Sequence, residues 1–407
     1  MGKQIVELKG IAWDHQRATR PFAGIAASLP GGGEVQVRWD VRSLHDFETG
    51  SVEELASKYD MVMIDHPTLG RAVDSNSLIA LEELFDAEVV NALARDCVGK
   101  SFESYSYHGR RWAVPIDAAA QVLVYRSDRL DRDELPETWE DVLRLSQSGL
   151  GVALPLKGSH GFLSVVAMAH AQGRLGADRD VWALERWVDS DGCEEAIEVV
   201  RRLVEGPAFE GLESGPIAVY ELMAESRISL CPAMFGYVTY ASQSWSGLST
   251  ELDFANAPRW AKRATHGSVL GGVGLAVSRA SKSVESATRI LETVMDPRVQ
   301  STVIGPRGGQ PPGQAWWSTR HLQSHVDSFY HSTRKTLDQA WIRPAIPGYA
   351  ELQLASGMVI GNGLARRWSS RAIATELRTV WEKHLHSAAT SHGDALWAGT
   401  AACDMVE

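Results

Sequence analysis

The sequence predicts an α/β fold of two lobes with a ligand cleft between them, and three observations support this prediction. Short apolar runs of strand length alternate with helical stretches, which is typical of parallel βαβ units. The 407 residues are enough for two lobes that each bury a core. Residues 109–126 have the pattern of a chain that leaves one sheet and enters a second, and a corner between lobes is a usual place for a ligand.

Residues 109–126 are expected to form the hinge. A basic turn leads into a short apolar strand, and Pro115 is expected to break the ladder of that strand because proline has no amide proton to donate. Three alanines at residues 118–120 then line a corner, and a second buried strand follows at residues 122–125. A chain of this kind crosses from one lobe to the other.

The remaining elements follow from apolar periodicity and turn chemistry. Other strands are predicted at residues 5–11, 35–39, 61–64, 227–231 and 270–277. Helices are predicted at residues 52–58, in the loop region 78–84, in two parts of 178–203, and at 217–225, 283–296 and 375–385. Thr138, with Asp141 three residues later, predicts one further helix start of the capping-box type. Residues 232–242, 244–265 and 305–313 are expected to be irregular.

Composition excludes several classes of function. A net charge of −11 argues against nucleic acid as a partner, since phosphates require clustered Lys and Arg. No apolar run approaches the roughly 18–20 residues of a membrane helix, so no membrane insertion is expected. The four cysteines form no CxxC pair and neither phosphate-binding glycine motif is present, so no metal and no cofactor is predicted. The disulfide state stays open for all four, which are Cys97, Cys193, Cys231 and Cys403.

Five segments resemble, in order and spacing, the extracellular solute-binding proteins of ABC importers, the sugar-binding family that includes maltose-binding protein. These segments are residues 6–13, 59–67, 109–126, 271–278 and 283–296. The resemblance implies a type II periplasmic-binding-protein-like fold that closes by hinge bending on a small polar solute, which is sugar-like or a small organic acid or amine. It also implies an ABC permease as a partner, and a monomer is expected.

The lobes are expected to share the chain unequally. Residues 1–113 and 262–308 are assigned to lobe 1, and residues 114–261 and 309–407 to lobe 2. Hinge bending is expected at residues 114–117, 256–260 and 309–312.

Ligands of open parallel sheets lie beyond the carboxyl ends of the strands, and this rule selects the candidate site. A Trp at a strand end suits a stacking wall, a hinge carboxylate accepts hydroxyl or amine donors, and an Arg holds a carboxylate. Each candidate also has an ordinary structural role open to it, such as a helix cap, a core position or a surface ion pair. The predicted ligand-binding residues are Trp13, Asp14, His15, His66, Asp117, Tyr237, Gly272, Arg307, Gln310, Arg343 and Tyr349.

Two other classes of function stay open. A cytoplasmic lyase, isomerase or hydrolase on the same scaffold would use His15, His66 and Asp117 as acid and base groups. Cys231 at a strand end is a candidate nucleophile, but alanines stand where thiaminase-type enzymes, which resemble this fold, carry their cysteine, and no GxSxG elbow is present. An intracellular ligand sensor that docks a partner is the other alternative.

The first residues of the sequence bear on the cellular compartment in which the protein is expected. Residues 1–4 lead into the first strand without the pattern of a secretory leader, which predicts a cytoplasmic chain as the sequence stands. A periplasmic or extracellular location is expected instead if a leader has been trimmed. The pattern does not select the ligand.

Overall fold

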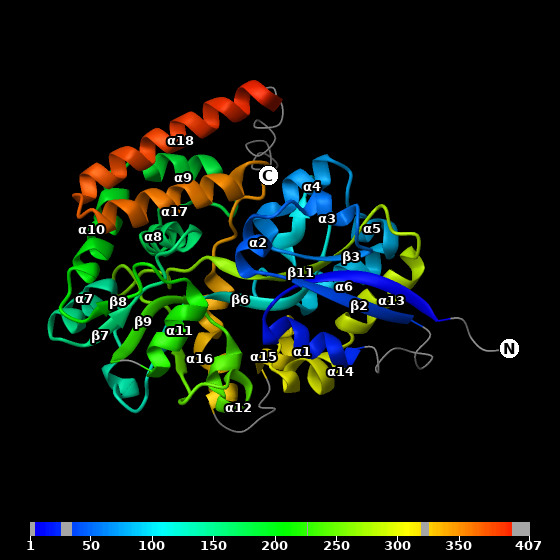
Figure 1. The fold of residues 1–407 in the computed structure, drawn as a ribbon, viewed down its shortest axis with the longest axis horizontal. Coiled ribbons are helices and arrows are strands. Elements are labelled where there is room, and N and C mark those ends of the chain that lie inside the picture. Colours follow the sequence, from blue (N-terminus) through cyan, green and yellow to red (C-terminus); the bar gives the residue numbers. More distant parts are fainter. Residues whose placement is uncertain (1–4, 26–34, 226, 319–324, 393–407) are drawn as a thin grey trace.

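The computed structural model describes residues 5–25, 35–225, 227–318 and 325–392. They form two α/β lobes that lie beside each other (Figure 1). Lobe 1 holds the strands β1 (Val6–Trp13), β2 (Val35–Arg42), β3 (Met61–Ile64) and β11 (Leu270–Val277). Lobe 2 holds β7 (Gly151–Ala153), β8 (Phe209–Glu210), β9 (Ile228–Phe235) and β10 (Asp253–Ala255). The strand β6 (Val114–Tyr125) belongs to both.

In lobe 1 the strands run in the order β2-β1-β3-β11-β6. β1 is parallel to β2 and β3, whereas β11 is antiparallel to β3. Every residue of β3 is buried, which matches its continuous apolar run. The helices of this half are α1 (Gln16–Ile25), α2 (Leu44–Thr49), α3 (Val52–Ala56), α4 (Leu69–Asp74), α5 (Leu81–Leu84), α6 (Ala87–Asp96), α13 (Val284–Met295) and α14 (Pro297–Val299).

β6 is one continuous buried strand of 12 residues that both lobes share. Its first part, up to Ala120, pairs with β11, and its second part, from Gln121, pairs with β9. The predicted break at Pro115 is therefore wrong, although the crossing itself is confirmed. Pro115 lies opposite Gly274, next to a register shift between Val273 and Gly274, so its missing donor falls at an irregularity of the ladder.

Lobe 2 has the strand order β6-β9-β7-β8, with β10 paired to β6. β9 continues through Pro232 to Phe235, so the loop predicted from residue 232 begins four residues too early. The register shift between Val122 and Val124 of β6 lies opposite this proline and absorbs its missing N–H. The helices of this half are α7 (Trp139–Gln147), α8 (Ser159–Ala171), α9 (Val181–Val188), α10 (Asp191–Val204), α11 (Pro216–Glu225), α12 (Gln243–Ser246), α16 (His325–Gln339), α17 (Tyr349–Ala365) and α18 (Ser370–His392), and α15 (Gln314–Ser318) packs on α16.

The capping box predicted for Thr138 and Asp141 is confirmed. The hydroxyl of Thr138 accepts from the N–H of Asp141 at 3.2 Å, and the carboxylate of Asp141 accepts from the N–H of Thr138 at 3.0 Å. The predicted elements at residues 61–64 and 270–277 have the observed bounds, and 283–296 differs by one residue at each end. The lobe boundaries given above stay a prediction, and Cys403 lies outside the described residues.

Glycines let α17 approach α8 closely. A Cβ placed on Gly357 would lie 1.9 Å from the carbonyl oxygen of Gly158, just before α8 begins. Gly158 itself has a φ of 61°, a conformation that favours glycine. The N-terminus of α8 is therefore held against the middle of α17. α17 also contacts α2 of lobe 1.

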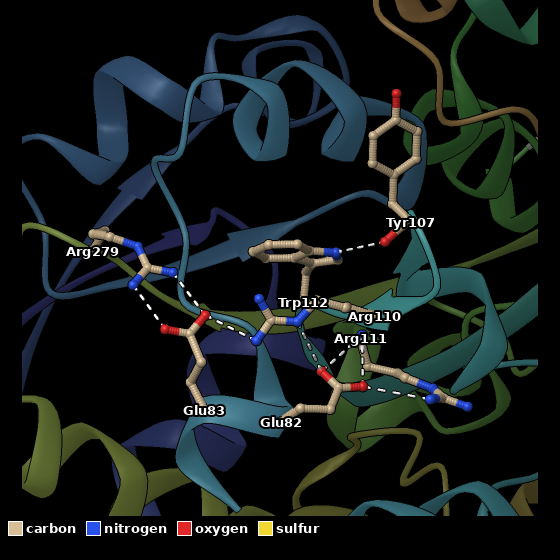
Figure 2. A network of polar contacts seen from close by, with 7 residues as sticks. All are labelled: Glu82, Glu83, Tyr107, Arg110, Arg111, Trp112 and Arg279. Atoms are coloured by element: carbon tan, nitrogen blue, oxygen red, sulfur yellow. Dashed lines mark hydrogen bonds and ion pairs between the residues drawn. The ribbon is translucent and has the colours of Figure 1, made fainter. Parts of the chain in front are cut away.

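A network of ion pairs holds the chain just before β6 (Figure 2). Glu83 accepts from Arg279 at 2.9 Å and from Arg110 at 3.0 Å. Glu82 accepts from the backbone and the side chain of Arg111, and the indole of Trp112 donates to the carbonyl of Tyr107 at 2.9 Å. α5 is thereby fastened to the β4–β5 hairpin (Ser106–Tyr107 and Arg110–Arg111), which leads into the shared strand.

Replacing Glu83 with Gln is expected to lower the free energy of unfolding by about 0.5–1 kcal/mol at pH 7, the scale of a partly exposed ion-pair network. The hydrogen bond from Arg279, against the effect of burial, lowers the pKa of Glu83 from 4.5 to about 2. Because the folded pKa is the lower one, this stabilisation is complete above the unfolded pKa and is lost as pH falls towards 2.

Urea unfolding at two pH values checks this. The loss caused by Glu83→Gln should shrink by more than half between about pH 7 and pH 3. Glu88→Gln, on the exposed part of α6, is the control and should change stability little at either pH. An equal loss for Glu83→Gln at both pH values would show that the ion pairs do not fasten this segment.

Candidate functional site

A small cavity lies between the lobes where strands of both halves end. Its volume is about 30 Å³, enough for one or two waters. Lobe 1 contributes Trp13, Phe47 and Asp65, and lobe 2 contributes Phe235 and Tyr237. The other lining residues are Arg17, Leu44, Glu48, Ala119, Gly271, Gly272, Val273 and Arg343.

Arg17 reaches from the first turn of α1 in lobe 1 into lobe 2. Its guanidinium carbon lies 3.9 Å from the ring centroid of Tyr237, a cation–π contact. Nη1 donates to the carbonyl of Gly236 at 3.2 Å and to Oε1 of Gln310 at 2.8 Å. Nε lies 3.2 Å from Oδ1 of Asp117, and the Arg17 side chain is 4% exposed. A buried cation thus joins the two lobes at the cavity wall.

Asp117 lies behind Arg17 on β6. Burial raises the pKa of its carboxyl to about 6, and the charge of Arg17 only partly opposes this rise. Neither carboxylate oxygen accepts a hydrogen bond of ordinary geometry from the described residues, although the backbone of Gln310 helps to lower this pKa. Ionised Asp117 is therefore under-solvated, because the ion pair and this weak contact do not replace water fully.

Trp13 and His15 form an aromatic wall at the end of β1. Their rings stack at a centroid distance of 4.6 Å and an interplanar angle of 5°, and Tyr237 meets the Trp13 ring edge-on at 5.8 Å. Nδ1 of His15 accepts from the N–H of Arg17 at 3.1 Å, so this ring also caps α1. Burial and the charges of Arg17 and Arg20 lower the pKa of His15 to about 3, which keeps the imidazole neutral.

A second buried ion pair lies at the lobe 1 side of the cavity. Nη2 of Arg343 donates to both oxygens of Asp65, at 2.8 and 3.0 Å, and Nε donates to the carbonyl of Leu270 at 3.3 Å. Burial raises the pKa of Asp65, and the nearby Arg343 charge opposes that rise without cancelling it. The segment before α17 is thereby fixed to the end of β3.

Glu48 joins α2 of lobe 1 to the N-terminus of α8 in lobe 2. One oxygen lies 3.3 Å from Nε2 of His160, and the other accepts from the hydroxyl of Ser159 at 3.0 Å. Burial acts to raise the pKa of Glu48, but His160, Ser159 and the Arg343 charge together lower it. Glu48 also borders an outer hollow of about 830 Å³ that opens beside the small cavity.

Five of the predicted ligand residues lie at or beside the cavity. Trp13, Tyr237, Gly272 and Arg343 line it, and His15 stacks on Trp13. Their part in ligand binding stays a prediction.

Two predicted residues lie behind the wall. Asp117 pairs with Arg17, as described above. The amide of Gln310 donates to the carbonyl of Ala118 at 2.8 Å, and its oxygen accepts from Arg17 and from the N–H of Val238. Gln310 thus helps to position Arg17, and its part in ligand binding stays a prediction.

The other four predicted residues do not line the cavity, and their part in ligand binding stays a prediction. Asp14 is exposed next to β2, where its N–H donates to the carbonyl of Arg42. Arg307 is exposed and donates back to the carbonyl of Val303 at 3.2 Å. His66 and Tyr349 are buried. Nδ1 of His66 lies 3.5 Å from Oδ1 of Asp65, and the hydroxyl of Tyr349 has no hydrogen-bond partner among the described residues.

Sequence reasoning missed several residues that build the site. These are Arg17, Phe47, Glu48, Asp65 and His160. Arg17 lies in the first turn after β1, and Asp65 lies directly after β3, so a stricter use of the strand-end rule would have selected both. Glu48 and His160 lie on helices, where no local signal distinguishes them from surface residues.

Two of the groups proposed for catalysis, His66 and Cys231, are poorly suited to it. His66 is fully buried, and burial, followed by the charges of Arg343 and Arg179, holds its pKa well below the usual value. Burial raises the pKa of the Cys231 thiol to about 12, so it is not a reactive thiolate. Cys97, Cys193 and Cys231 are free and buried. Within the described ranges no group of three His, Cys, Asp or Glu is arranged to hold a metal, and no helix is long and apolar enough to cross a membrane.

Comparison with known proteins agrees with this geometry. The family model of bacterial extracellular solute-binding proteins matches residues 31–198. An ABC transporter solute-binding protein of Agrobacterium radiobacter, solved in complex with ribitol, superposes with a TM-score of 0.75 and 18% identity over 93% of this chain and 98% of that one. One of Agrobacterium vitis with bound D-mannitol gives a TM-score of 0.74 and 17% identity over 94% and 99%.

The sugar-binding protein MalE of Xanthomonas citri gives a TM-score of 0.71 and 14% identity, covering 94% of this chain and 98% of that one. No curated protein sequence matches the chain. The matches confirm the two-lobed periplasmic-binding-protein-like fold and the resemblance to the extracellular solute-binding proteins.

The Arg17–Asp117 pair predicts the direction in which folding stability changes with pH. The folded pKa of Asp117 is about 6 and its ordinary value 3.8, so the folded state binds the extra proton and stability falls as pH rises between these values. Asp117→Asn removes this loss while leaving Gln310, Gly236 and Tyr237 around Arg17. Relative to the wild type, the variant is expected to be more stable near pH 7.5 than near pH 4, because only the wild type gives up the proton of Asp117 over this range.

Denaturant unfolding across this pH range provides the measurement. Arg17→Met, which removes the counter-charge, is the contrasting variant and should destabilise the protein by about 3–5 kcal/mol near pH 7.5. A loss of several kcal/mol in Asp117→Asn at that pH would mean that the ion pair, and not desolvation, dominates at this position.

Proposed function

We propose that this chain binds a small polar solute in the cleft between its lobes and closes over it by bending at the shared strand. The observation that carries the proposal is the cavity itself, whose aromatic and charged walls come from both lobes. Aromatic faces suit the apolar face of a sugar or polyol, and carboxylates and guanidinium groups suit its hydroxyls.

Trp13 supports this function most directly. It lines the cavity, yet it is 1% exposed and its indole N–H has no acceptor among the described residues. A buried donor of this kind costs about 1–3 kcal/mol unless it is paired, and a solute oxygen would pair it. The same residue would therefore stack on the solute and donate to it.

Closure rests on groups that already span the lobes. Arg17 contacts Tyr237 and Gly236, and Glu48 contacts Ser159 and His160. In a more open arrangement of the lobes, these polar groups would be hydrated instead of contacting the other lobe. The cavity of about 30 Å³ is smaller than a sugar, so binding requires Arg17 or its neighbours to move aside as the solute enters.

The relatives suggest a solute class and a partner. The compared proteins carry ribitol and D-mannitol, and both are described as ABC transporter solute-binding proteins. We extend to this chain a sugar or polyol as solute and a transporter permease as partner. The family is described as extracellular, which favours the second of the two expected compartments, outside the cytoplasm.

The solute that stays with the protein through gentle purification tests the proposal. Mass spectrometry should identify it, and calorimetry should show that the emptied protein binds it again. Trp13→Ala is expected to weaken binding by about 1–3 kcal/mol, because it removes one aromatic wall. Trp112→Ala, which removes a buried indole outside the cavity, is the control and should keep the affinity.

Two results would contradict the proposal. One is a protein that retains no solute and binds none of ribitol, D-mannitol and maltose. The other is an unchanged affinity in Trp13→Ala, which would place the binding site elsewhere.

A further inference from the structure

The outer hollow differs in chemistry from the small cavity it adjoins. Of the described residues that line its volume of about 830 Å³, none is Phe, Tyr or Trp. Aliphatic side chains of three helices line it: Leu44 of α2, Pro216 and Ile217 of α11, and Leu354 and Met358 of α17. Polar and charged side chains also border it, namely His45, Glu48, Lys157, Ser159, His160 and Glu221. The hollow thus lacks the aromatic faces that would stack on further sugar rings.

Met358 shows how the hollow is left open to solvent. It is 53% exposed although its side chain is large and apolar. Leu354 precedes it by one turn of α17 and is half-buried, so the two side chains form one stripe along the helix. Ile217 in the first turn of α11 is also half-buried, and it lines the same hollow.

The two spaces are neighbours. Leu44 and Glu48 line both, and the polar contacts of Glu48 with Ser159 and His160 lie at their shared border. A solute that fills both therefore meets polar and aromatic groups at its inner end and aliphatic groups at its outer end. A hollow of about 830 Å³ lies in the upper part of the range for small-molecule sites.

We propose that the natural solute is amphiphilic, with a polar head in the inner cavity and an alkyl-like apolar portion in the outer hollow. This rests on the proposed solute binding and names the class of solute. The apolar portion contributes through burial of its methylenes against the aliphatic stripe, so it adds affinity whichever hydroxyl-rich head precedes it.

The test uses methyl, butyl, hexyl and octyl β-D-glucosides as probes, at concentrations below micelle formation, with binding measured by calorimetry. Each added methylene is expected to raise the affinity about two- to fourfold, the range for partial to full burial. Met358→Glu places a charge in the hollow and should reduce this gain at least tenfold for the octyl compound. Val89→Glu, at a 40% exposed position on α6, is the matched control and should leave the gain unchanged.

Three results would overturn the inference: an affinity that does not rise with chain length, a rise that Met358→Glu leaves intact, or no binding of any member of the series. These results differ from failure of the proposed function, in which the emptied protein does not take back a polar solute. A protein that binds ribitol, D-mannitol or maltose but gains nothing from the alkyl chain is a solute-binding protein without the apolar compartment.

Discussion

One buried guanidinium stands at the centre of the contact between the two lobes. Arg17 starts in lobe 1, lies over the ring of Tyr237 and bonds the carbonyl of Gly236, both in lobe 2. Gln310 and Asp117 hold it from behind. Because a charge taken out of water is costly unless it is well paired, the surrounding groups are constrained to these positions for as long as the lobes are closed.

The shared strand supplies the second constraint. β6 passes from a ladder with β11 to a ladder with β9 without ending, so the lobes can rotate only by bending or twisting this strand and the segments beside it. Gly272 marks how tightly the two central strands approach. It has a φ of 121°, and a Cβ there would lie 2.3 Å from the carbonyl oxygen of Asp117. At Gly272 the cavity wall is therefore formed by backbone atoms, so side chains at the lobe edges are the groups that can recognise a solute.

Much of the fold could be predicted because local signals decide it. Residue type alone indicates the two strands at residues 61–64 and 270–277, because both are apolar runs of strand length. It likewise indicates the helix start at Thr138, through the capping box. Continuity of β6 through Pro115 could not be predicted, since it depends on a register shift in β11, more than a hundred residues away in sequence. α8 is buried on nearly every side and shows no helical alternation of apolar and polar residues, so it gave no signal of its own.

The candidate site was only partly predictable for a related reason. Trp13, Tyr237 and Gly272 follow from the strand-end rule or the glycine pattern, and they line the cavity. Arg17 and Glu48 act only through partners that the fold brings from the other lobe, so their neighbours in sequence say nothing of their role. The same positional rule also selects Arg307 and Asp14, whose side chains are exposed.

The most direct test of the account is the radius of gyration of Arg17→Met, measured by small-angle X-ray scattering beside the wild type. Both proteins are measured at the same concentration of the retained solute, and Arg38→Met, an exposed position on β2 whose ion-pair partner Asp40 lies on the same strand, is the control. If Arg17 joins the lobes, the wild type and Arg38→Met are compact and Arg17→Met has a larger radius. Equal radii for all three would contradict the claim that this guanidinium holds the closed state.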